Sequence, residues 1–240
     1  MIRASNSLIK ELKKQKRENC SLLFLDNLKI INDILKKGIV PKFIITSSSE
    51  VSFETDCPIY SADAKTIEQL SDSKTPQGVV CVVEYKLNMP EKPKTNFLVL
   101  DGVQDPGNAG TLVRTAVACG FEYVYFIESV HATNSKLVRS SVGTIFDCKI
   151  FEVSRNDFIN MFKKWNLKLL KADMHGENIF NFKADSQIGV VVGNEGQGVS
   201  DEIAQICSQS VSIPMKNNVE SLNASVSGSI IMYQISKEQF

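Results

Sequence analysis

Four polar residues in this 240-residue sequence have side chains that could take part in chemistry: Asn108, Arg114, Glu195 and Asn223. Arg114 lies among apolar residues of a predicted helix, where a guanidinium usually has a carboxylate or phosphate partner. Asn223 carries an amide that is costly to bury without hydrogen-bond partners. Asn108 follows a Pro-Gly turn and is predicted to cap the next helix, so a purely structural role is the alternative for this residue.

Glu195 lies within a glycine-rich segment, residues 193–198, between a predicted strand and a predicted helix. Glycines at such a turn let the backbone approach a ligand closely. The spacing Gly193-x-x-Gly196-x-Gly198 differs from the dinucleotide fingerprint and from the Walker loop, and Glu195 would repel a pyrophosphate. The segment therefore favours a ligand that is cationic or bears hydroxyl groups, and the alternative is a tight turn in which Glu195 caps a helix.

A third polar segment, residues 213–225, contains Asn223 and runs into a predicted helix over residues 220–235. The start of this helix is rich in small residues, namely Ser221, Ala224, Ser225, Ser227, Gly228 and Ser229. Small side chains let another backbone come close, and apolar residues recur between them at helical spacing. We therefore predict close helix packing, within the chain or across a dimer, for all of these residues except Asn223.

These segments follow predicted strands in the second half of the chain. The strands are predicted over residues 97–100, 123–127, 149–153, 168–172, 188–192 and 211–213. Helices are predicted over residues 108–119, 135–141, 157–165, 201–207 and 220–235. Apolar strands that alternate with helices predict an α/β fold with a mainly parallel sheet covered on both faces. Ligands of such sheets bind beyond the carboxyl ends of the strands, where the polar segments lie.

The first half of the chain predicts a smaller α/β unit. Helices are predicted over residues 5–18, from Asp26 or Asn27 to Gly38, and over residues 63–70, with strands over residues 22–25, 43–46 and 78–84. The polar segment 85–96 contains two prolines, which remove backbone donors and oppose helix formation. We therefore expect one domain over residues 1–84, a linker over 85–96 and a second domain over 97–240.

The composition excludes several classes of protein. The chain is 43% hydrophobic, enough for proper cores, and it has no apolar run of about 18 residues that could span a membrane. The N-terminus lacks the apolar region of a signal peptide, so we expect a cytoplasmic protein. We expect reduced, mostly buried cysteines, because none of the six forms a C-x-x-C pair. They are Cys20, Cys57, Cys81, Cys119, Cys148 and Cys207.

The charges are unevenly distributed. The net charge is zero, which argues against a polycationic nucleic-acid binder. Within the first 17 residues, however, the basic side chains are opposed only by Glu11. They belong to Arg3, Lys10, Lys13, Lys14, Lys16 and Arg17. Such a basic helix face could contact phosphates, and a solvated helix end is the alternative.

Taken together and in this order, the three polar segments resemble the motifs of the SpoU (TrmH-type) RNA 2′-O-ribose methyltransferases, a branch of the SPOUT superfamily. The matching residues are 100–110 with Arg114, 193–198, and 213–215 with 219–225. Residues 134–143 are similar to the family's intermediate segment, and the resemblance covers residues 97–235. Residues 75–80 resemble the end of the ribosomal-protein L30e-like substrate-binding domain that many members carry.

The resemblance implies a SPOUT-type sheet with a deep C-terminal trefoil knot, preceded by the small α/β substrate-binding domain. It implies S-adenosylmethionine as the cofactor, a homodimer and no metal. The cofactor site would be lined by Gly193, Ile213 and Leu222, with Gly196, Pro214 and Met215 close by. The catalytic neighbourhood would contain Arg114, Glu195 and Asn223, with Asn108. Whether Asn108 and Arg114 act on the partner's cofactor is left open.

The implied reaction transfers a methyl group to a ribose hydroxyl of RNA. A developing alkoxide needs stabilisation, which Arg114 can supply, whereas a guanidinium, which stays protonated in proteins, is a poor proton acceptor. The N-terminal domain favours ribosomal RNA over transfer RNA as substrate. The alternatives are a tRNA ribose methyltransferase and a non-catalytic RNA-binding or ribosome-assembly protein with the same fold. The chain departs from the family at residues 24–27, where many members have a Val-Glu-Gly-like segment.

Overall fold

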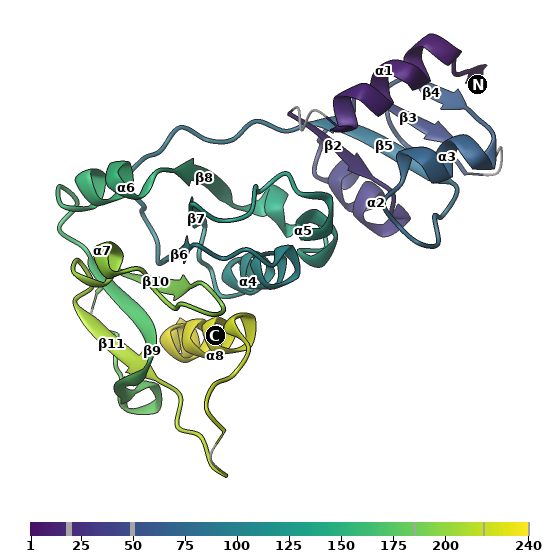
Figure 1. The fold of residues 1–240 in the computed structure, drawn as a ribbon. Coiled ribbons are helices and arrows are strands. Elements are labelled where there is room, and N and C mark those ends of the chain that lie inside the picture. The colour runs from purple at the N-terminus through teal and green to yellow at the C-terminus, as the bar shows by residue number, and fades with distance from the viewer. Residues whose placement is uncertain (18–20, 49–50, 185, 218, 240) are drawn as a thin grey trace. The chain divides into compact units, whose positions relative to one another are not determined.

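The structure is a computed structural model that describes residues 1–17, 21–48, 51–184, 186–217 and 219–239. The expectations that concern Glu18, Cys20 and Asn218 lie outside the described residues. The chain divides into two compact units, Met1–Lys86 and Leu87–Phe240, each with its own sheet (Figure 1). We describe each unit by itself.

Unit 1 is built on a five-stranded mixed sheet. In spatial order its strands are β1 (Ile2–Arg3), β4 (Ile59–Ser61), β3 (Phe43–Thr46), β5 (Val79–Glu84) and β2 (Leu22–Leu25). Its helices are α1 (Asn6–Arg17), α2 (Leu28–Lys36) and α3 (Ala64–Leu70). Strand β5 runs antiparallel to β2 and β3, while β1 and β3 are parallel to β4. Helices α1 and α3 share a core with the sheet, and α2 lies on the opposite face (Figure 1).

The sequence predicted most of unit 1, with two exceptions. Strands β1 and β4 were not predicted, because two or three residues carry too little periodicity to be recognised. Asn27, one of the two predicted caps, accepts a hydrogen bond from Ile30 N and starts α2. The other, Asp26, is buried and instead accepts hydrogen bonds from the backbone of Asp72 and Ser73, so it fixes the loop after α3.

Unit 2 contains a six-stranded sheet in which every neighbouring pair is parallel. In spatial order the strands are β11 (Gln209–Ser212), β9 (Lys168–Asn178), β10 (Ile188–Gly193), β6 (Phe97–Asp101), β7 (Tyr123–Ile127) and β8 (Lys149–Val153). The helices are α4 (Pro106–Ala118), α5 (Ser135–Ser140), α6 (Arg155–Phe162), α7 (Asp201–Ala204) and α8 (Ala224–Ser236), with short 3-10 turns at Thr144–Asp147, Ile179–Asn181 and Lys237–Gln239. Helices α4, α5 and α8 lie on one face and α6 and α7 on the other (Figure 1). The prediction of a parallel sheet covered on both faces is confirmed.

Three helices of unit 2 begin at residues other than those predicted. Helix α6 begins at Arg155, two residues before the predicted start, because Ser154 is its cap. Helix α4 begins at Pro106, two residues before the predicted start, because Asp105 is its cap. Helix α8 begins at Ala224, with Asn223 as its cap, so residues 220–222 are not helical as expected. Strand β9 is longer than predicted, because its second half pairs with β11 beyond an irregularity between Ser210 and Val211.

The segment expected to be a linker, residues 85–96, divides between the two units after Lys86. Within unit 2, Asn88 exchanges two hydrogen bonds with the backbone of Ile150 in β8. The hydroxyl of Tyr125 donates to the carbonyl of Glu91 at 2.6 Å. Residues 88–91 therefore pack along unit 2.

The described cysteines are free, as expected. Cys57, Cys81 and Cys119 are buried, and the other two described cysteines are partly exposed. Burial raises the pKa of Cys119 to about 11 and that of Cys148 to about 12, which disfavours the reactive thiolate.

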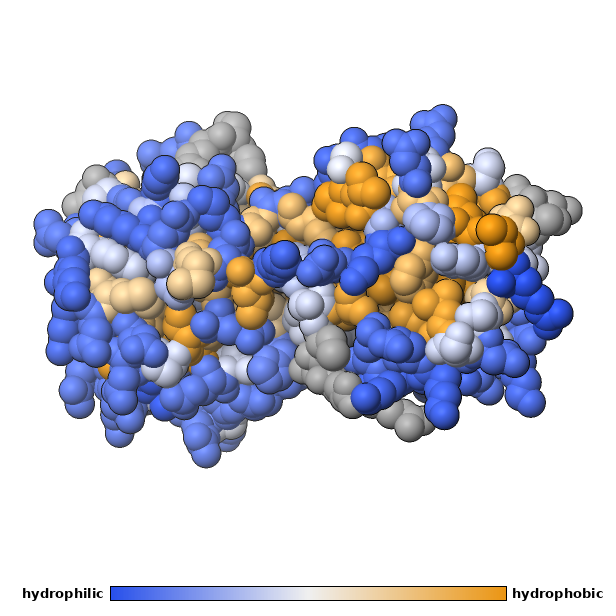
Figure 2. Space-filling model, turned by 90° about the horizontal axis from the view of Figure 1, so that it is seen from above, coloured by the Kyte–Doolittle hydropathy of each residue, from blue (hydrophilic) through white to orange (hydrophobic). Residues whose placement is uncertain are grey.

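Most side chains on the face shown in Figure 2 are hydrophilic, and apolar residues gather in patches between them. The large apolar side chains that are exposed in unit 2 include Phe180, Val226 and Tyr233. Among the described residues, no helix has the length and apolar character needed to cross a bilayer.

Candidate active site

A cavity of about 470 Å³ lies at the carboxyl ends of β10 and β11 and beside the middle of β9. Its walls come from residues 171–174, 192–199, 211–213 and Met215, 220–222 and 224, and from Ser227 and Ile231 of α8. These stretches come from the three strands, from the segments that follow β10 and β11, and from α8. The cavity therefore lies where a parallel sheet is expected to bind its ligand.

The glycine-rich segment forms one wall of the cavity as a closed turn. Asn194 and Gly198 exchange two backbone hydrogen bonds of 2.9 Å, and the Asn194 side chain accepts from the N–H groups of Gly196 and Gln197. At Gly193 a Cβ atom would lie 2.2 Å from the carbonyl carbon of Gly198. Only glycine fits there, and Gly198 has a φ of +72°, which also favours glycine.

Five of the six predicted cofactor-binding residues line this cavity: Gly193, Gly196, Ile213, Met215 and Leu222. The sixth, Pro214, is exposed and is not among the described lining residues. Its neighbours Ile213 and Met215 line the cavity on either side of it in the sequence.

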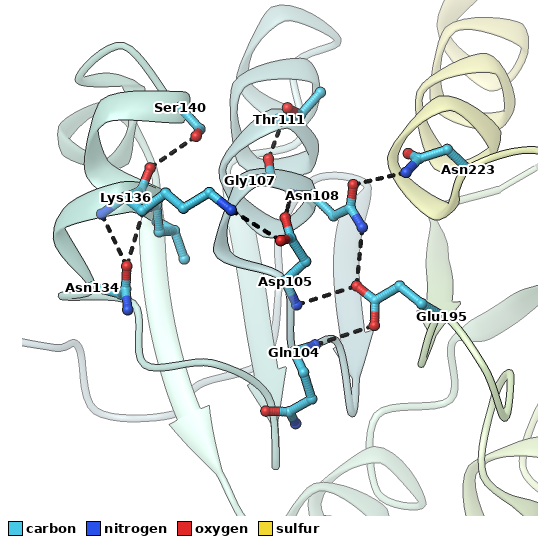
Figure 3. Close-up of polar contacts among 11 residues, drawn as sticks. Gln104, Asp105, Gly107, Asn108, Thr111, Asn134, Lys136, Ser140, Glu195 and Asn223 are labelled. Atoms are coloured by element: carbon cyan, nitrogen blue, oxygen red, sulfur yellow. Dashed lines mark hydrogen bonds and ion pairs between the residues drawn. The ribbon is translucent and has the colours of Figure 1, made fainter. Parts of the chain in front are cut away.

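Glu195 also lines the cavity and connects two loops of the site (Figure 3). Its Oε1 accepts hydrogen bonds from Asn108 Nδ2 at 3.0 Å and from Asp105 N at 3.3 Å, and its Oε2 accepts from Gln104 N at 3.4 Å. Partial burial raises the pKa of Glu195, but the hydrogen bonds from Asn108 and from the backbone outweigh it and hold the pKa below its usual range. Glu195 is therefore an ionised acceptor with a fixed orientation.

Asn223 extends this network to the last helix. Its Nδ2 donates to Asn108 Oδ1 at 3.0 Å, and its Oδ1 accepts from the backbone of Ser225 at 2.9 Å and of Val226 at 3.3 Å. These bonds orient both amides, because each oxygen accepts and each nitrogen donates. Asn223, Asn108 and Glu195 thus form a directed chain of hydrogen bonds (Figure 3).

The cap of α4 corrects one expectation from the sequence. Asp105, not Asn108, caps the helix, because its Oδ1 accepts from Asn108 N at 2.8 Å. This bond, together with the ammonium of Lys136 at 3.0 Å, holds the pKa of Asp105 below its usual range. The Asn108 side chain is consequently free to join Glu195 and Asn223 (Figure 3).

Arg114 is not part of this network. It is exposed on α4 and forms no hydrogen bond or ion pair with any described residue, contrary to the expectation that its guanidinium has a partner. It is also absent from the described lining of the cavity. Three of the four predicted catalytic residues therefore meet within this chain, and the fourth faces solvent.

An ion cluster built on the buried Asp101, beside the cavity, was not predicted from the sequence. Asp101 is 1% exposed, and its Oδ1 accepts from Arg155 Nε at 3.3 Å and Nη2 at 3.1 Å. Arg155 Nη1 lies 2.7 Å from Glu128 Oε2. Burial lowers the pKa of Arg155, but the Asp101 and Glu128 carboxylates outweigh it and the pKa is raised. No local pattern indicates this cluster, because its members meet only through the strand order.

The charges of the described lining residues decide which ligands fit the cavity. Asp173, Glu195 and Glu220 contribute carboxylates. The cation Lys171 is paired with Asp173 at 2.7 Å. This surplus of negative charge disfavours a pyrophosphate and suits a cationic ligand. Among the described residues, no group of three His, Cys, Asp or Glu side chains could hold a metal ion.

Solved structures with the same architecture define the class of fold. A crystal structure titled as an AdoMet-bound rRNA methyltransferase from Sinorhizobium meliloti superposes with a TM-score of 0.86, covering 100% of this chain and 98% of that one at 21% identity. This chain thus has the same α/β fold, with a parallel sheet, as that structure.

Residues 95–233 match the family model described as the SpoU rRNA Methylase family, and the chain belongs to this family. A 23S rRNA (guanosine(2553)-2'-O)-methyltransferase of Bacillus subtilis (strain 168) is 26% identical, with 97% of each chain covered. A 23S rRNA (guanosine-2'-O-)-methyltransferase of Neisseria meningitidis serogroup B is 29% identical over 75% of this chain and 77% of its own. The resemblance inferred from the three polar segments is confirmed.

Proposed function

We propose that this protein is an S-adenosylmethionine-dependent 2′-O-ribose methyltransferase that acts on ribosomal RNA. The observation that supports the proposal is that one residue, Glu195, belongs both to the cavity and to the polar network. Glu195 lines the cavity and accepts hydrogen bonds from Asn108, which in turn accepts from Asn223. A site for the methyl donor and a site for a reacting hydroxyl would then share a wall.

The cavity fits the proposed cofactor in size and chemistry. Its volume of about 470 Å³ falls within the range of ligand pockets, roughly 300 to 1,000 Å³. Apolar side chains of Val192, Ile213, Leu222 and Ile231 suit an adenosine, and the carboxylates suit a cation. S-Adenosylmethionine supplies a methyl group activated on a positively charged sulfonium.

Residues of the chain would then orient the acceptor and stabilise the charge that develops on it. Arg114 is the proposed donor to the ribose oxygen or to an adjacent phosphate, because its guanidinium is permanently charged and has no partner among the described residues. Glu195 and Asn223 would fix the amide of Asn108 so that its position does not change during the reaction.

We propose that the active form is a homodimer. The exposed Val226 and Tyr233, together with the partly exposed Ile230 between them, recur at helical spacing on α8. Apolar side chains in such a row are typical of an interface. We further propose that Arg114 of one protomer acts on the cavity of its partner, which would explain why it has no partner among the described residues of its own chain.

The remaining parts follow from the family resemblance. Unit 1 is the proposed L30e-like RNA-binding domain, with the basic helix α1 as a phosphate-contacting face. Unit 2 is proposed to contain the C-terminal trefoil knot of the family, with the last segment threaded through a loop and the knotted loops holding the cofactor. Cytoplasmic location follows from the proposed substrate.

Ribosomal RNA is favoured over transfer RNA by the extent of the similarity. The Bacillus subtilis 23S rRNA methyltransferase matches 97% of this chain, so both units are included. A tRNA substrate remains the competing proposal, since unit 2 alone carries the family motifs.

Calorimetry and methylation mapping test the proposal together. The purified protein should bind S-adenosylmethionine and not NAD, and RNA from a strain without the protein should lack one ribose methylation that its parent contains. Binding without any lost methylation would support a non-catalytic RNA-binding protein, and a lost methylation in tRNA would refute the rRNA assignment. Absence of S-adenosylmethionine binding would overturn the proposal as a whole.

A further inference from the structure

Hydrogen bonds join both ends of the glycine-rich wall of the cavity to the carboxyl end of β6. At its entry, Asn194 Nδ2 donates to the carbonyl of Gly102 at 2.9 Å. At its exit, the N–H of Ser200 donates to Asp101 Oδ2 at 2.7 Å. The register of the sheet places Asp101 beside Gly193, so this carboxylate lies at the base of the loop. The position of the loop therefore depends on the position of Asp101.

A carboxylate as deeply buried as Asp101 requires a compensating charge, because an unpaired buried ion is costly. Arg155 supplies that charge with two nitrogens on one carboxylate oxygen. Arg155 is the first residue of α6, where the helix dipole disfavours a cation. Its partners, rather than the helix, account for an arginine at this position.

Arg155 is also connected to the loop after β6, whose backbone donates hydrogen bonds to Glu195. Its outer nitrogen pairs with Glu128, a residue with a positive φ of 46°. The carbonyl of Glu128 accepts from Gln104 Nε2 at 2.8 Å, and the backbone N–H of Gln104 donates to Glu195. One guanidinium therefore connects the turn after β7, the loop after β6 and the loop after β10.

We propose that Arg155 is a positioning residue of the cavity, which fixes the glycine-rich wall through Asp101 and the Glu195-binding loop through Glu128. The proposal rests on the proposed function only for the identity of the ligand. The alternative is an ion cluster that stabilises the fold without influencing the cavity.

The test combines ligand affinity with amide exchange. Arg155→Gln should weaken S-adenosylmethionine binding by about tenfold and speed exchange of the Asn194, Gly198 and Ser200 amides by a similar factor. Lys164→Gln removes the same charge from an exposed site near the end of α6 and should leave both measurements unchanged. Arg155→Lys keeps the charge without the planar fork, and we expect an intermediate effect.

A double-mutant cycle separates positioning from simple stabilisation. In Asp101→Asn/Arg155→Gln no buried charge is left unpaired, and the amide oxygen introduced by Asp101→Asn can still accept from Ser200. The double variant should therefore bind the ligand more tightly than the two single effects combined would predict. If Arg155→Gln does not fold, the Arg155→Lys variant and a cycle between Asp101→Asn and Arg155→Lys carry the test.

Two results would overturn the proposal. One is a melting temperature lowered by Arg155→Gln while ligand affinity and loop exchange stay within about twofold of wild type. The other is an absence of coupling between residues 101 and 155 in affinity. If the wild-type protein does not bind S-adenosylmethionine, the proposed function fails, while the exchange measurement still decides whether Arg155 positions the loop.

Discussion

The side-chain amide of Asn108 donates to the Glu195 carboxylate across 3.0 Å, and this bond joins the loop after β6 to the loop after β10. The two residues are widely separated in the sequence and meet because β10 and β6 are neighbours in the sheet. Glu195→Gln would replace one acceptor oxygen by an NH₂ group that faces N–H donors. At least one donor would then lose its acceptor, which destabilises the site by about 1 to 3 kcal/mol. We expect turnover to fall by roughly tenfold or more. Glu68→Gln makes the same change at an exposed carboxylate of α3, outside the cavity, and is the control.

The pH dependence of stability gives a second test of the same carboxylate. The pKa of Glu195 is lowered in the folded protein, so its contribution to stability is complete above its unfolded pKa of about 4.3. That contribution is lost as the pH falls through the lower, folded pKa. The melting temperature of wild type minus that of Glu195→Gln should therefore shrink below about pH 4.3 and stay constant above it. A difference that grows on acidification would contradict this assignment.

Asn223 has two roles that can be separated by substitution. Asn223→Ser retains a capping oxygen for α8 but loses the Nδ2 that donates to Asn108, so its melting temperature should stay near wild type while turnover falls. Asn223→Ala also loses the cap, with a further cost of about 1 kcal/mol in stability. Thermal unfolding and single-turnover kinetics of the two variants measure the two effects. Equal turnover in Asn223→Ser and wild type would exclude a role for the amide nitrogen.

Arg114→Ala should leave both cofactor affinity and melting temperature unchanged, because Arg114 is exposed, forms no hydrogen bond or ion pair with a described residue and does not line the cavity. Turnover should fall strongly, and Arg114→Lys should not restore it if the guanidinium binds through two nitrogens. Mixed dimers of Arg114→Ala and Glu195→Gln protomers would contain one site with both native residues if Arg114 acts on the partner's cavity. Activity recovered on mixing, measured against each variant alone, is the expected outcome; no recovery would place Arg114 in its own protomer's site.

Gly193→Ala should disrupt the cavity wall, since the added Cβ would lie 2.2 Å from the backbone of Gly198. We expect loss of cofactor binding and a lower melting temperature. Gly196→Ala is the matched control for stability, because the nearest atom to its Cβ would be the Asn194 Oδ1 at 3.7 Å. Comparable melting temperatures for the two variants would show that the turn tolerates a different backbone.

The basic helix α1 is not uniformly available to RNA. Lys16 donates to the carbonyl of Leu70 and pairs with Asp72 at 2.8 Å, and Lys13 is hydrogen-bonded to Gln69. Lys10 is exposed and has no such partner among the described residues. Lys10→Ala should reduce the salt dependence of RNA binding by about one charge without loss of stability, whereas Lys16→Ala should lower stability. An unchanged salt slope in Lys10→Ala would exclude this lysine from the RNA-binding face.

Local signals in the sequence predicted the elements well and the contacts between them poorly. Apolar runs such as residues 97–100 and 188–192 identified buried strands, because both of their faces are covered by helices. The cap of α4 was misassigned although Pro106 at the first helical position indicated Asp105. The start of α8 was also misassigned, to residue 220, although the preference of asparagine for caps pointed to a start after Asn223.

The sequence predicted most residues of the candidate site but not how they are arranged. The motif order indicated Asn108, Glu195 and Asn223, but their mutual hydrogen bonds depend on a strand order that no local pattern specifies. The pairing of Asp101 with Arg155 could not be predicted for the same reason, because Asp101 ends β6 and Arg155 begins α6. The isolation of Arg114 was also unexpected, because a sequence does not distinguish a partner within the chain from one outside it.

The double use of Asn223 has a consequence for how the protein matures. The side-chain amide of Asn223 both caps α8 and donates to Asn108. The docking of α8 and the completion of the polar network are therefore one event. Until α8 docks, Asn108 can still donate to Glu195 but lacks the donor to its Oδ1, so its amide is held on one side only. Catalytic activity should therefore appear only when α8 docks. A substitution that delays docking should reduce the activity before it reduces the secondary structure.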